Sequence, residues 1–413
     1  MKLLQPLRHR DFRLLWLGMS TSLMGDGVFL VALAWQVYLI SNSIGAMSAV
    51  GVALTAPQVA TLLVGGVVAD RFDRRVVLIV SDAVRGVCLL VLAVLAAGGG
   101  LRLVHVYVLV AIYGAATGFF GPAFDAIVPS LLPPEDLEQA NALDQFVRPV
   151  AARIAGPAVG GLLLSLGEPQ WALGLDAMTF VVSVVCVAAM RPPRWAPAPA
   201  AESVWKEAVT GARYVAGRPW LWATFVAASF TYLCFLGPTE VLLPYLIKNV
   251  MHGSGGDLGL VLTAGGVGAL LAAVIVGQRG VPRRDVTFIY VTWALATLAV
   301  SGYGLAVAGW QLAVFCALFN SLEAAGTIAW ATLKQRLVEP ALLGRVSSLD
   351  WFISIALLPA SYALTAPVAN AIGARATLIL AGVVGAAITA GFLLVPGVRD
   401  VEGVSRAPAG VSV

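Results

Sequence analysis

Long apolar blocks alternate with short charged segments along the whole chain. A helix of about 20 apolar residues spans the hydrocarbon core of a bilayer and satisfies its own backbone hydrogen bonds there. We therefore predict an all-α integral membrane protein with twelve transmembrane helices, over residues 12–40, 45–69, 76–97, 103–127, 142–166, 170–190, 219–247, 255–279, 285–306, 311–332, 343–371 and 374–396.

Composition supports this reading and excludes several others. Of the 413 residues, 59% are hydrophobic and only 12% are charged, whereas about 25% of residues are charged in a soluble domain. This excludes a soluble enzyme, a nucleic-acid-binding protein and a secreted disulfide scaffold. The four cysteines lie singly in apolar blocks and the three histidines lie at block edges, so we expect no metal site and no cofactor.

The basic residues predict how the chain is oriented. Twenty of the 26 Lys and Arg fall in segments on one side of the predicted membrane, and three fall on the other side. Short loops rich in Lys and Arg stay in the cytoplasm. We therefore expect both termini of this protein to be cytoplasmic, in a bacterial inner membrane.

The longest segment between blocks divides the predicted helices into two sets of six. We expect an N-terminal bundle over 1–190, a cytoplasmic connector over 191–218, a C-terminal bundle over 219–398 and a flexible tail over 399–413. Within the connector, apolar residues at helical spacing predict a short amphipathic helix on the membrane surface.

Internal repeats support this division. The sequence Gly51-Val-Ala-Leu-Thr-Ala recurs 208 residues later as Gly259-Leu-Val-Leu-Thr-Ala. The segment Leu143-Asp-Gln-Phe recurs 206 residues later as Leu349-Asp-Trp-Phe, and Trp16 recurs at the same offset as Trp222. The offset is half the chain, which predicts two parallel halves, an architecture of secondary transporters.

The end of the second block and the loop that follows it read Gly66-Val-Val-Ala-Asp70-Arg71-Phe-Asp-Arg74-Arg75. Here the sequence resembles the major facilitator superfamily, whose pattern between helices 2 and 3 is Gly-x-x-x-Asp-Arg/Lys-x-Gly-Arg-Arg/Lys. The resemblance implies that Gly66, Asp70, Arg71, Arg74 and Arg75 form a cytoplasmic gate that latches the two halves. The alternative is a basic loop that only sets orientation.

The fifth block contains Arg153-Ile-Ala-Gly156-Pro157-Ala-Val-Gly160-Gly161. It resembles the Gly-Pro-x-x-Gly-Gly motif of exporters and antiporters in the same superfamily. Pro157 should bend the helix, and the glycines should let another helix pack closely, with the glycine-rich helix 255–279 as the expected neighbour. Ordinary small-residue packing is the alternative.

Three further features are similar to the branch that includes macrolide and multidrug efflux pumps and siderophore exporters. They are His9-Arg-Asp-Phe-Arg-Leu-Leu-Trp16, the Asp82-Ala-Val-Arg85 pair and Leu343-Gly-Arg345-Val. The block 103–127 lacks the Arg that drug exporters carry in helix 4.

Acidic residues deep in predicted spans are candidates for proton coupling, because a buried carboxyl requires a partner or a wet cavity. Asp26 lies about 21 Å into its block and Glu323 about 18 Å, at 1.5 Å per residue. Glu240 is a weaker candidate. The alternative for Asp26 is a static ion pair with Arg153 or Arg85.

The resemblance implies that helices 1, 4, 7 and 10 line a central cavity, and polar stripes on three of these helices agree with that. Aromatic side chains beside acids suit a cationic, partly apolar substrate. The residues expected to bind it are Ser22, Phe29, Gln36, Tyr113, Thr117, Phe120, Tyr232, Asn320 and Thr327.

These observations predict a proton-coupled antiporter that exports small organic molecules by alternating access, as a monomer in the bilayer. One alternative is an exporter dedicated to a siderophore or a self-made antibiotic. An uptake permease is less favoured, as is a membrane sensor without transport. The chain contains no nucleotide-binding loop or histidine cluster, and we do not expect an enzyme.

Overall fold

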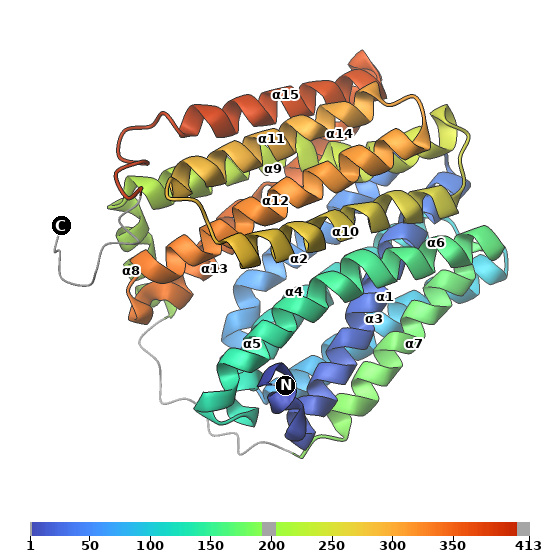
Figure 1. Cartoon of the computed structure of the whole chain (residues 1–413). Coiled ribbons are helices and arrows are strands. Elements are labelled where there is room, and N and C mark those ends of the chain that lie inside the picture. Colours follow the sequence, from blue (N-terminus) through green and yellow to red (C-terminus); the bar gives the residue numbers. More distant parts are fainter. Residues whose placement is uncertain (1, 192–203, 403–413) are drawn as a thin grey trace. The chain divides into compact units, whose positions relative to one another are not determined.

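The computed structural model describes residues 2–191 and 204–402, and these residues contain helices and no strands. Figure 1 shows the helices in chain order. They are η1 (Lys2–Arg8), α1 (Arg10–Ile40), α2 (Ile44–Arg71), α3 (Arg74–Ala97), α4 (Leu103–Leu131), α5 (Pro134–Pro149), η2 (Val150–Ala155), α6 (Gly156–Leu166), α7 (Pro169–Ala188), α8 (Val204–Ala216), α9 (Pro219–Tyr245), η3 (Leu246–Val250), α10 (Gly255–Arg279), α11 (Asp285–Leu305), α12 (Gly309–Leu337), α13 (Pro340–Ala356), α14 (Leu358–Ile372) and α15 (Ala374–Phe392).

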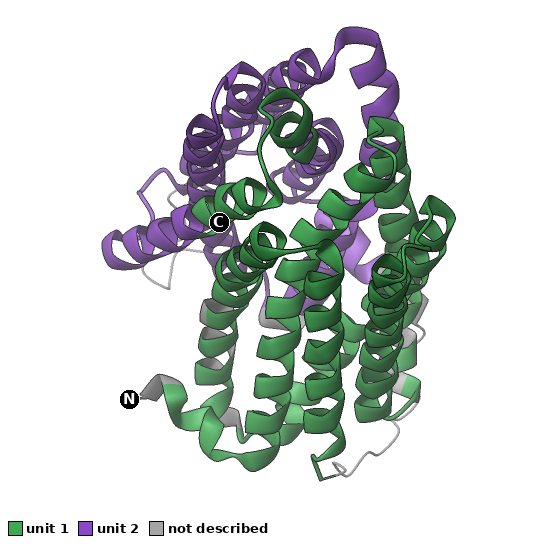
Figure 2. Ribbon diagram, turned by 90° about the vertical axis from the view of Figure 1, so that its right-hand side faces the viewer, with its two compact units in different colours: residues 1–199, 244–266 green, residues 200–243, 267–413 purple. Residues whose placement is uncertain are grey.

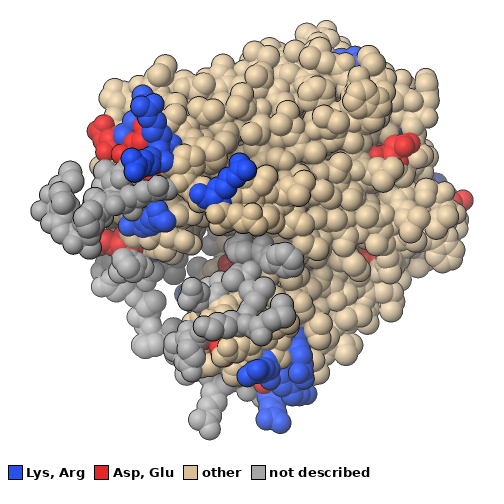
Figure 3. Space-filling model, in the orientation of Figure 1, with Lys and Arg blue, Asp and Glu red and all other residues tan. Residues whose placement is uncertain are grey.

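Twelve helical segments in the described part of the chain are long and apolar enough to cross a membrane. They coincide in order with the twelve predicted blocks, so the all-α membrane fold is confirmed. On the face drawn in Figure 3, the long sides of the helices carry almost no charge, and Lys and Arg gather near helix ends. Exposed apolar side chains such as Leu260 and Trp310 are those that lipid would cover.

The chain forms two compact units, which Figure 2 colours separately. Unit 1 contains residues 1–199 and 244–266, and unit 2 contains 200–243 and 267–413. Residues 244–266 therefore group with unit 1, whereas the sequence analysis places them in the second half. The stretch Pro192–Pro199 and most of the expected tail lie outside the described residues.

Each unit repeats one packing pattern. In unit 1, α3 packs against α4 and α7, and in unit 2, α11 packs against α12 and α15. The repeated aspartates also behave alike: Asp144 pairs with Arg148 at 3.1 Å, and Asp350 pairs with Lys334. These parallels support the internal duplication that the sequence repeats predict.

The helix expected in the connector is present as α8. It packs against α13, and a Cβ on Gly211 would lie 3.2 Å from Leu349 Cδ1. Val215 is 6% exposed and belongs to the apolar core of unit 2. The C-terminal end of α8 is therefore held by contacts with the rest of unit 2. The amphipathic pattern by itself predicts only a position on the membrane surface.

The fifth span changes its helical geometry before Pro157. Proline lacks an amide hydrogen, so Pro157 cannot donate to the carbonyl of Arg153. The preceding turn, η2, is a π-helix in which the Gly156 amide donates to the carbonyl of Ala151. The bend expected at Pro157 thus takes the form of a π-helical turn, a feature frequent at functional sites.

Glycine allows α6 to lie directly on α1. A Cβ built on Gly156 would lie 2.6 Å from Gly27 Cα, and one on Gly160 would lie 3.2 Å from Val28 Cα. Side chains cannot fit at such distances, so the backbones themselves are in contact. The expectation that these two glycines face the helix 255–279 is therefore corrected, because their neighbour is α1.

The expected contact with α10 is made by Gly161. A Cβ on Gly161 would lie 2.8 Å from Gly259 Cα, and a Cβ on Gly266 would lie 2.1 Å from the Arg153 carbonyl oxygen. Both contacts lie within unit 1. The Gly-Pro-x-x-Gly-Gly segment is consequently held on two sides.

Replacing Gly156 with leucine should destabilise unit 1, because overpacking a tight interface costs about 1–3 kcal/mol. We expect Gly156→Leu to lower the apparent melting temperature of the purified protein in detergent by several degrees. Gly121→Ala is the matched control, since a Cβ there meets nothing within 4 Å among the described residues. Equal melting temperatures for both variants would contradict the packing described here.

Candidate functional site

Asp26 lies in the middle of α1 and faces two other helices of unit 1. The Tyr113 hydroxyl of α4 donates a hydrogen bond to its Oδ1. Its Oδ2 lies 3.8 Å from Nη1 of Arg85 on α3, and its side chain is 30% exposed. Asp26 is therefore in contact with a hydroxyl donor, a cation and solvent-accessible space at once.

Arg85 is the buried cation of this cluster. Its side chain is 3% exposed and forms an ion pair with Asp82, one turn earlier on α3. The rings of Phe120 and Phe180 each lie 4.5 Å from its guanidinium carbon. Because an Arg side chain does not lose its proton in proteins, the charge remains inside the unit and must be balanced there.

Asp82 supplies that balance. It is 0% exposed, and besides Arg85 it accepts a hydrogen bond of 2.5 Å from the Ser183 hydroxyl of α7. A cation and a hydroxyl donor on the same carboxyl favour its ionised form. Asp82 and Arg85 thus form a neutral, buried pair.

Asp176 of α7 is the third carboxyl. It is 0% exposed, and its Oδ1 accepts a hydrogen bond of 3.1 Å from Thr179. Within the part of the chain that the structure describes, its Oδ2 has no hydrogen-bond partner. A Cβ on Gly25 would lie 2.0 Å from Asp176 Oδ1, so the glycine before Asp26 makes room for this carboxyl. The cluster therefore contains three carboxyls and one guanidinium.

The structure brings several residues expected to bind substrate to this cluster. Phe29 packs on Tyr113 with ring centroids 4.8 Å apart, and Phe120 covers Arg85. Ser22 and Thr117 are bound within their own helices, to the carbonyls of Met19 and Tyr113. The last residue expected on α1, Gln36, is partly exposed.

In unit 2 the expected residues fall on α9 and α12. The Thr327 hydroxyl donates to Glu323 at 3.0 Å, and the Asn320 amide donates to the Cys316 carbonyl at 2.9 Å. An aromatic row runs from Tyr232 through Phe235 to Phe319. Glu240 of α9 is partly buried. Unit 2 thus carries acids beside hydroxyls and aromatic rings, as unit 1 does.

The sequence analysis left open a static ion pair between Asp26 and Arg85 or Arg153, and the structure shows only a loose contact with Arg85. Arg85 is near Asp26, but its hydrogen bond goes to Asp82, and the gap of 3.8 Å exceeds hydrogen-bond length. Arg153, the other suggested partner, has an exposed side chain on η2. Asp26 therefore has a guanidinium beside it that does not hydrogen-bond to it.

The loop that is expected to form the gate is held by hydrogen bonds within unit 1. Asp73 caps the start of α3 by accepting from the Arg75 amide at 2.9 Å. Arg74 donates to the Ala126 carbonyl of α4 at 2.9 Å, and Arg75 Nε donates to the Val187 carbonyl of α7 at 2.9 Å. Basic groups at helix C-termini are stabilising, so the loop binds three helices together.

A close helix approach occurs at Gly65, next to Gly66. A Cβ on Gly65 would lie 2.7 Å from the Gly118 carbonyl oxygen, whereas a Cβ on Gly66 meets nothing within 4 Å among the described residues. Arg71 is exposed, and the side chain of Asp70 lies outside the described part.

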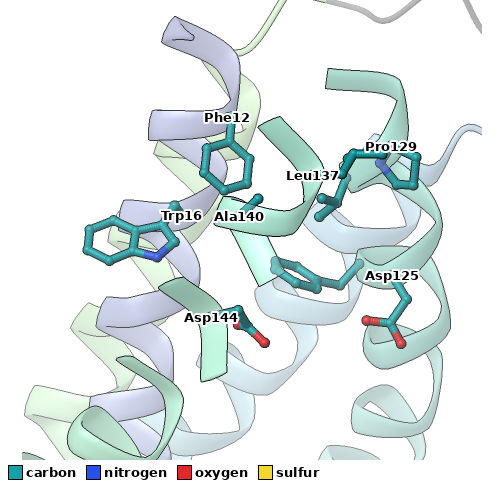
Figure 4. Close-up of a pocket in the computed structure, with 9 residues that line it drawn as sticks. Phe12, Trp16, Asp125, Pro129, Leu137, Ala140 and Asp144 are labelled. Atoms are coloured by element: carbon teal, nitrogen blue, oxygen red, sulfur yellow. The ribbon is translucent and has the colours of Figure 1, made fainter. Parts of the chain in front are cut away.

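A cavity of about 310 Å³ lies among α1, α4 and α5 of unit 1. Figure 4 shows Asp125 and Asp144 reaching toward each other from α4 and α5 across it. No residue expected to bind substrate lines this cavity. Its lining consists of Phe12, Trp16, Phe124, Asp125, Val128, Pro129, Leu137, Ala140 and Asp144.

The sequence interpretation gave Arg85 only the role of a possible static partner of Asp26, and it assigned neither Asp82 nor Asp176 to the site. The four-residue segment Asp82–Arg85 does indicate a buried polar site, since an acid and a base one helical turn apart on an apolar helix must face protein. Nothing in the sequence indicated that Asp176 joins them. Among the described residues, no group of three or more His, Cys, Asp or Glu is arranged to hold a metal ion.

Known proteins resemble the chain over nearly its full length. The enterobactin exporter EntS of Citrobacter koseri is 30% identical over 391 residues, which cover 91% of this chain and 90% of the exporter. EntS of an Escherichia coli strain is 30% identical over 392 residues, covering 91% of each protein.

Solved structures share the fold. A variant of the nucleoside transporter NupG has a TM-score of 0.71 at 13% identity, covering 93% of this chain and 99% of NupG. A bacterial homologue of the iron transporter ferroportin, in an inward-facing state, has a TM-score of 0.65 at 17% identity, covering 93% and 98%.

The family assignment rests on a match over residues 2–407 to the model of the transmembrane secretion effector family. The relatives and the fold agree with this match. The chain therefore belongs to the transmembrane secretion effectors, within the major facilitator superfamily of membrane transporters.

Proposed function

We propose that this transporter exports small organic molecules by alternating access and that protons returning inward drive the export. The observation that carries this proposal is the cluster of Asp26, Asp82, Arg85, Tyr113 and Asp176 inside unit 1. A membrane protein retains buried acids in such number mainly where they bind ions or substrate.

Asp26 is the proposed exchange site. Its exposed fraction gives it access to water, and the Tyr113 hydroxyl and Arg85 lie against its two oxygens. In this proposal a proton binds to the Asp26 carboxyl and leaves it through that access to water. Glu323 is the proposed partner in unit 2, and Glu240 is a weaker candidate.

The proposed substrate is an organic cation with apolar parts. Tyr113 contacts the carboxyl of Asp26 and stacks on Phe29, while Phe120 covers the neighbouring Arg85, and aromatic faces attract cations. Binding of a cation at Asp26 and binding of a proton there exclude each other electrostatically. This competition is the simplest physical basis for antiport.

A siderophore is the second candidate substrate. The relatives at 30% identity are enterobactin exporters, and they match nearly the whole of this chain. We infer further that both termini are cytoplasmic, that the loop from Gly66 to Arg75 latches the halves on that side, and that the protein acts as a monomer. The anchoring of Arg74 and Arg75 on neighbouring helices supports a rigid latch.

A susceptibility screen discriminates between these substrates. Cells that express the gene should tolerate higher concentrations of cationic dyes and macrolides than cells without it, because efflux lowers the internal concentration. Release of siderophore into the medium is measured in the same pair of strains. Increased siderophore release without any change in tolerance would favour the second candidate, and no change in either would contradict export.

Neutralising the proposed proton sites should uncouple transport. Asp26→Asn and Glu323→Gln should each reduce efflux driven by a pH gradient in proteoliposomes by about 10²-fold, since positioned acid–base groups contribute about 10²–10⁴-fold. The transported probe is a cationic dye identified by the screen. Glu168→Gln is the control, because Glu168 is exposed and lies between two spans.

Undiminished pH-driven efflux in both test variants would overturn the proton-coupling role of these residues. Loss of efflux in the Glu168→Gln control as well would show that the assay reports protein damage and not coupling, and would equally remove the support for the proposal.

A further inference from the structure

Asp176 has a buried carboxyl oxygen without a hydrogen-bond partner among the described residues of unit 1. Its Oδ1 accepts from Thr179 at 3.1 Å, and its Oδ2 is the atom left unsatisfied there. Buried polar atoms in native proteins are nearly all hydrogen-bonded, so an exception requires an explanation. An asparagine or serine would fill this position without the cost of an ionisable group.

Charge balance separates Asp176 from the other acids. The charged groups that act on it are Asp26 from α1 and Arg85 from α3, with the Tyr113 hydroxyl from α4 nearby. The α6 helix, which also packs on α7, carries no titratable side chain. Asp82 and Asp26 already share Arg85, so three carboxyls depend on one guanidinium, and burial disfavours a third negative charge at Asp176.

Asp176 lies against the same turn of α1 that carries Asp26. Gly25 lies against Asp176 Oδ1, and the next residue, Asp26, is the cluster acid with a 30% exposed side chain. The two acids interact electrostatically, so a proton that enters at Asp26 is proposed to pass on to Asp176. In that step an O–H bond of the Asp26 carboxyl breaks and an O–H bond on the Asp176 carboxylate forms.

We propose that Asp176 is a second proton-binding site, loaded through Asp26, and that the Asp82–Arg85 ion pair is the fixed charge beside it. This inference rests on the proposed proton coupling and adds a site to it. The transporter then stores one proton away from the substrate and exchanges another at Asp26. In this proposal Asp176 binds its proton before a cation reaches Asp26. The stored proton then removes one negative charge from the cluster.

Infrared difference spectroscopy of the full-length protein in liposomes tests this proposal without any substrate. Between acidic and alkaline pH, the wild type should lose the carbonyl stretch of a protonated carboxylic acid from Asp176. Asp176→Asn should lack that component. Thr179→Val should keep it at a higher frequency, because its hydrogen bond is gone.

The Asp26→Asn variant tests the route. It should retain the Asp176 component but fill it about tenfold more slowly after a drop in pH, since the relay acid is missing. Glu168→Gln should match the wild type. If Asp176→Asn does not fold, Thr179→Val still decides, because an unshifted spectrum would mean that no protonated Asp176 is present.

Two results would overturn the inference: a wild-type spectrum without this component, or one whose component does not respond to pH, which would make Asp176 a permanently neutral structural acid. The proposed function fails separately. If Asp26→Asn and Glu323→Gln retain pH-driven dye efflux while the Asp176 component titrates, proton coupling at those acids is wrong and the proton site remains.

Discussion

A guanidinium that cannot lose its charge lies inside an apolar helix bundle, and the arrangement of unit 1 follows from it. Arg85 is 3% exposed on its side chain and is enclosed by aromatic rings. Burial of an unpaired charge there would destabilise the bundle strongly. Asp82 and Ser183 therefore have defined positions, and α3 and α7 are tied together by polar contacts as well as by packing.

Three consecutive residues of α1 face three different neighbours. Successive residues on a helix are about 100° apart, so Gly25 and Gly27 lie on different sides of Asp26. Gly25 lies against Asp176 of α7, and Gly27 lies against Gly156 of α6. Contact with both helices fixes the rotation of α1, and this rotation directs Asp26 toward α3 and α4. The exporter-type glycine motif thereby contributes to placing the acid.

The sequence predicted the spans because lipid leaves the backbone few choices, and it predicted Asp26 and Tyr113 because each lies in a polar stripe on one helix. It did not predict the cluster, because Asp82, Arg85 and Asp176 come from two other helices whose rotation depends on tertiary packing. The role of Asp73 as a helix cap was missed for a simpler reason. The family pattern has glycine at this position, so the resemblance implies nothing about a capping side chain there.

The missing basic residue on α4 has a counterpart in the structure. Drug exporters of the superfamily carry an Arg in helix 4, whereas here Arg85 reaches from α3 to within 6.0 Å of the Tyr113 ring of α4. Because Asp82 holds it by a hydrogen bond, Arg85 remains 3.8 Å from Asp26 and lowers the cost of a charge there without neutralising it. In the proposed mechanism, the carboxylate of Asp26 then binds one more positive group, either a proton or a cationic substrate. With its basic residue on α3 instead of α4, unit 1 still allows a proton and a cationic substrate to compete for Asp26, as the proposed antiport requires.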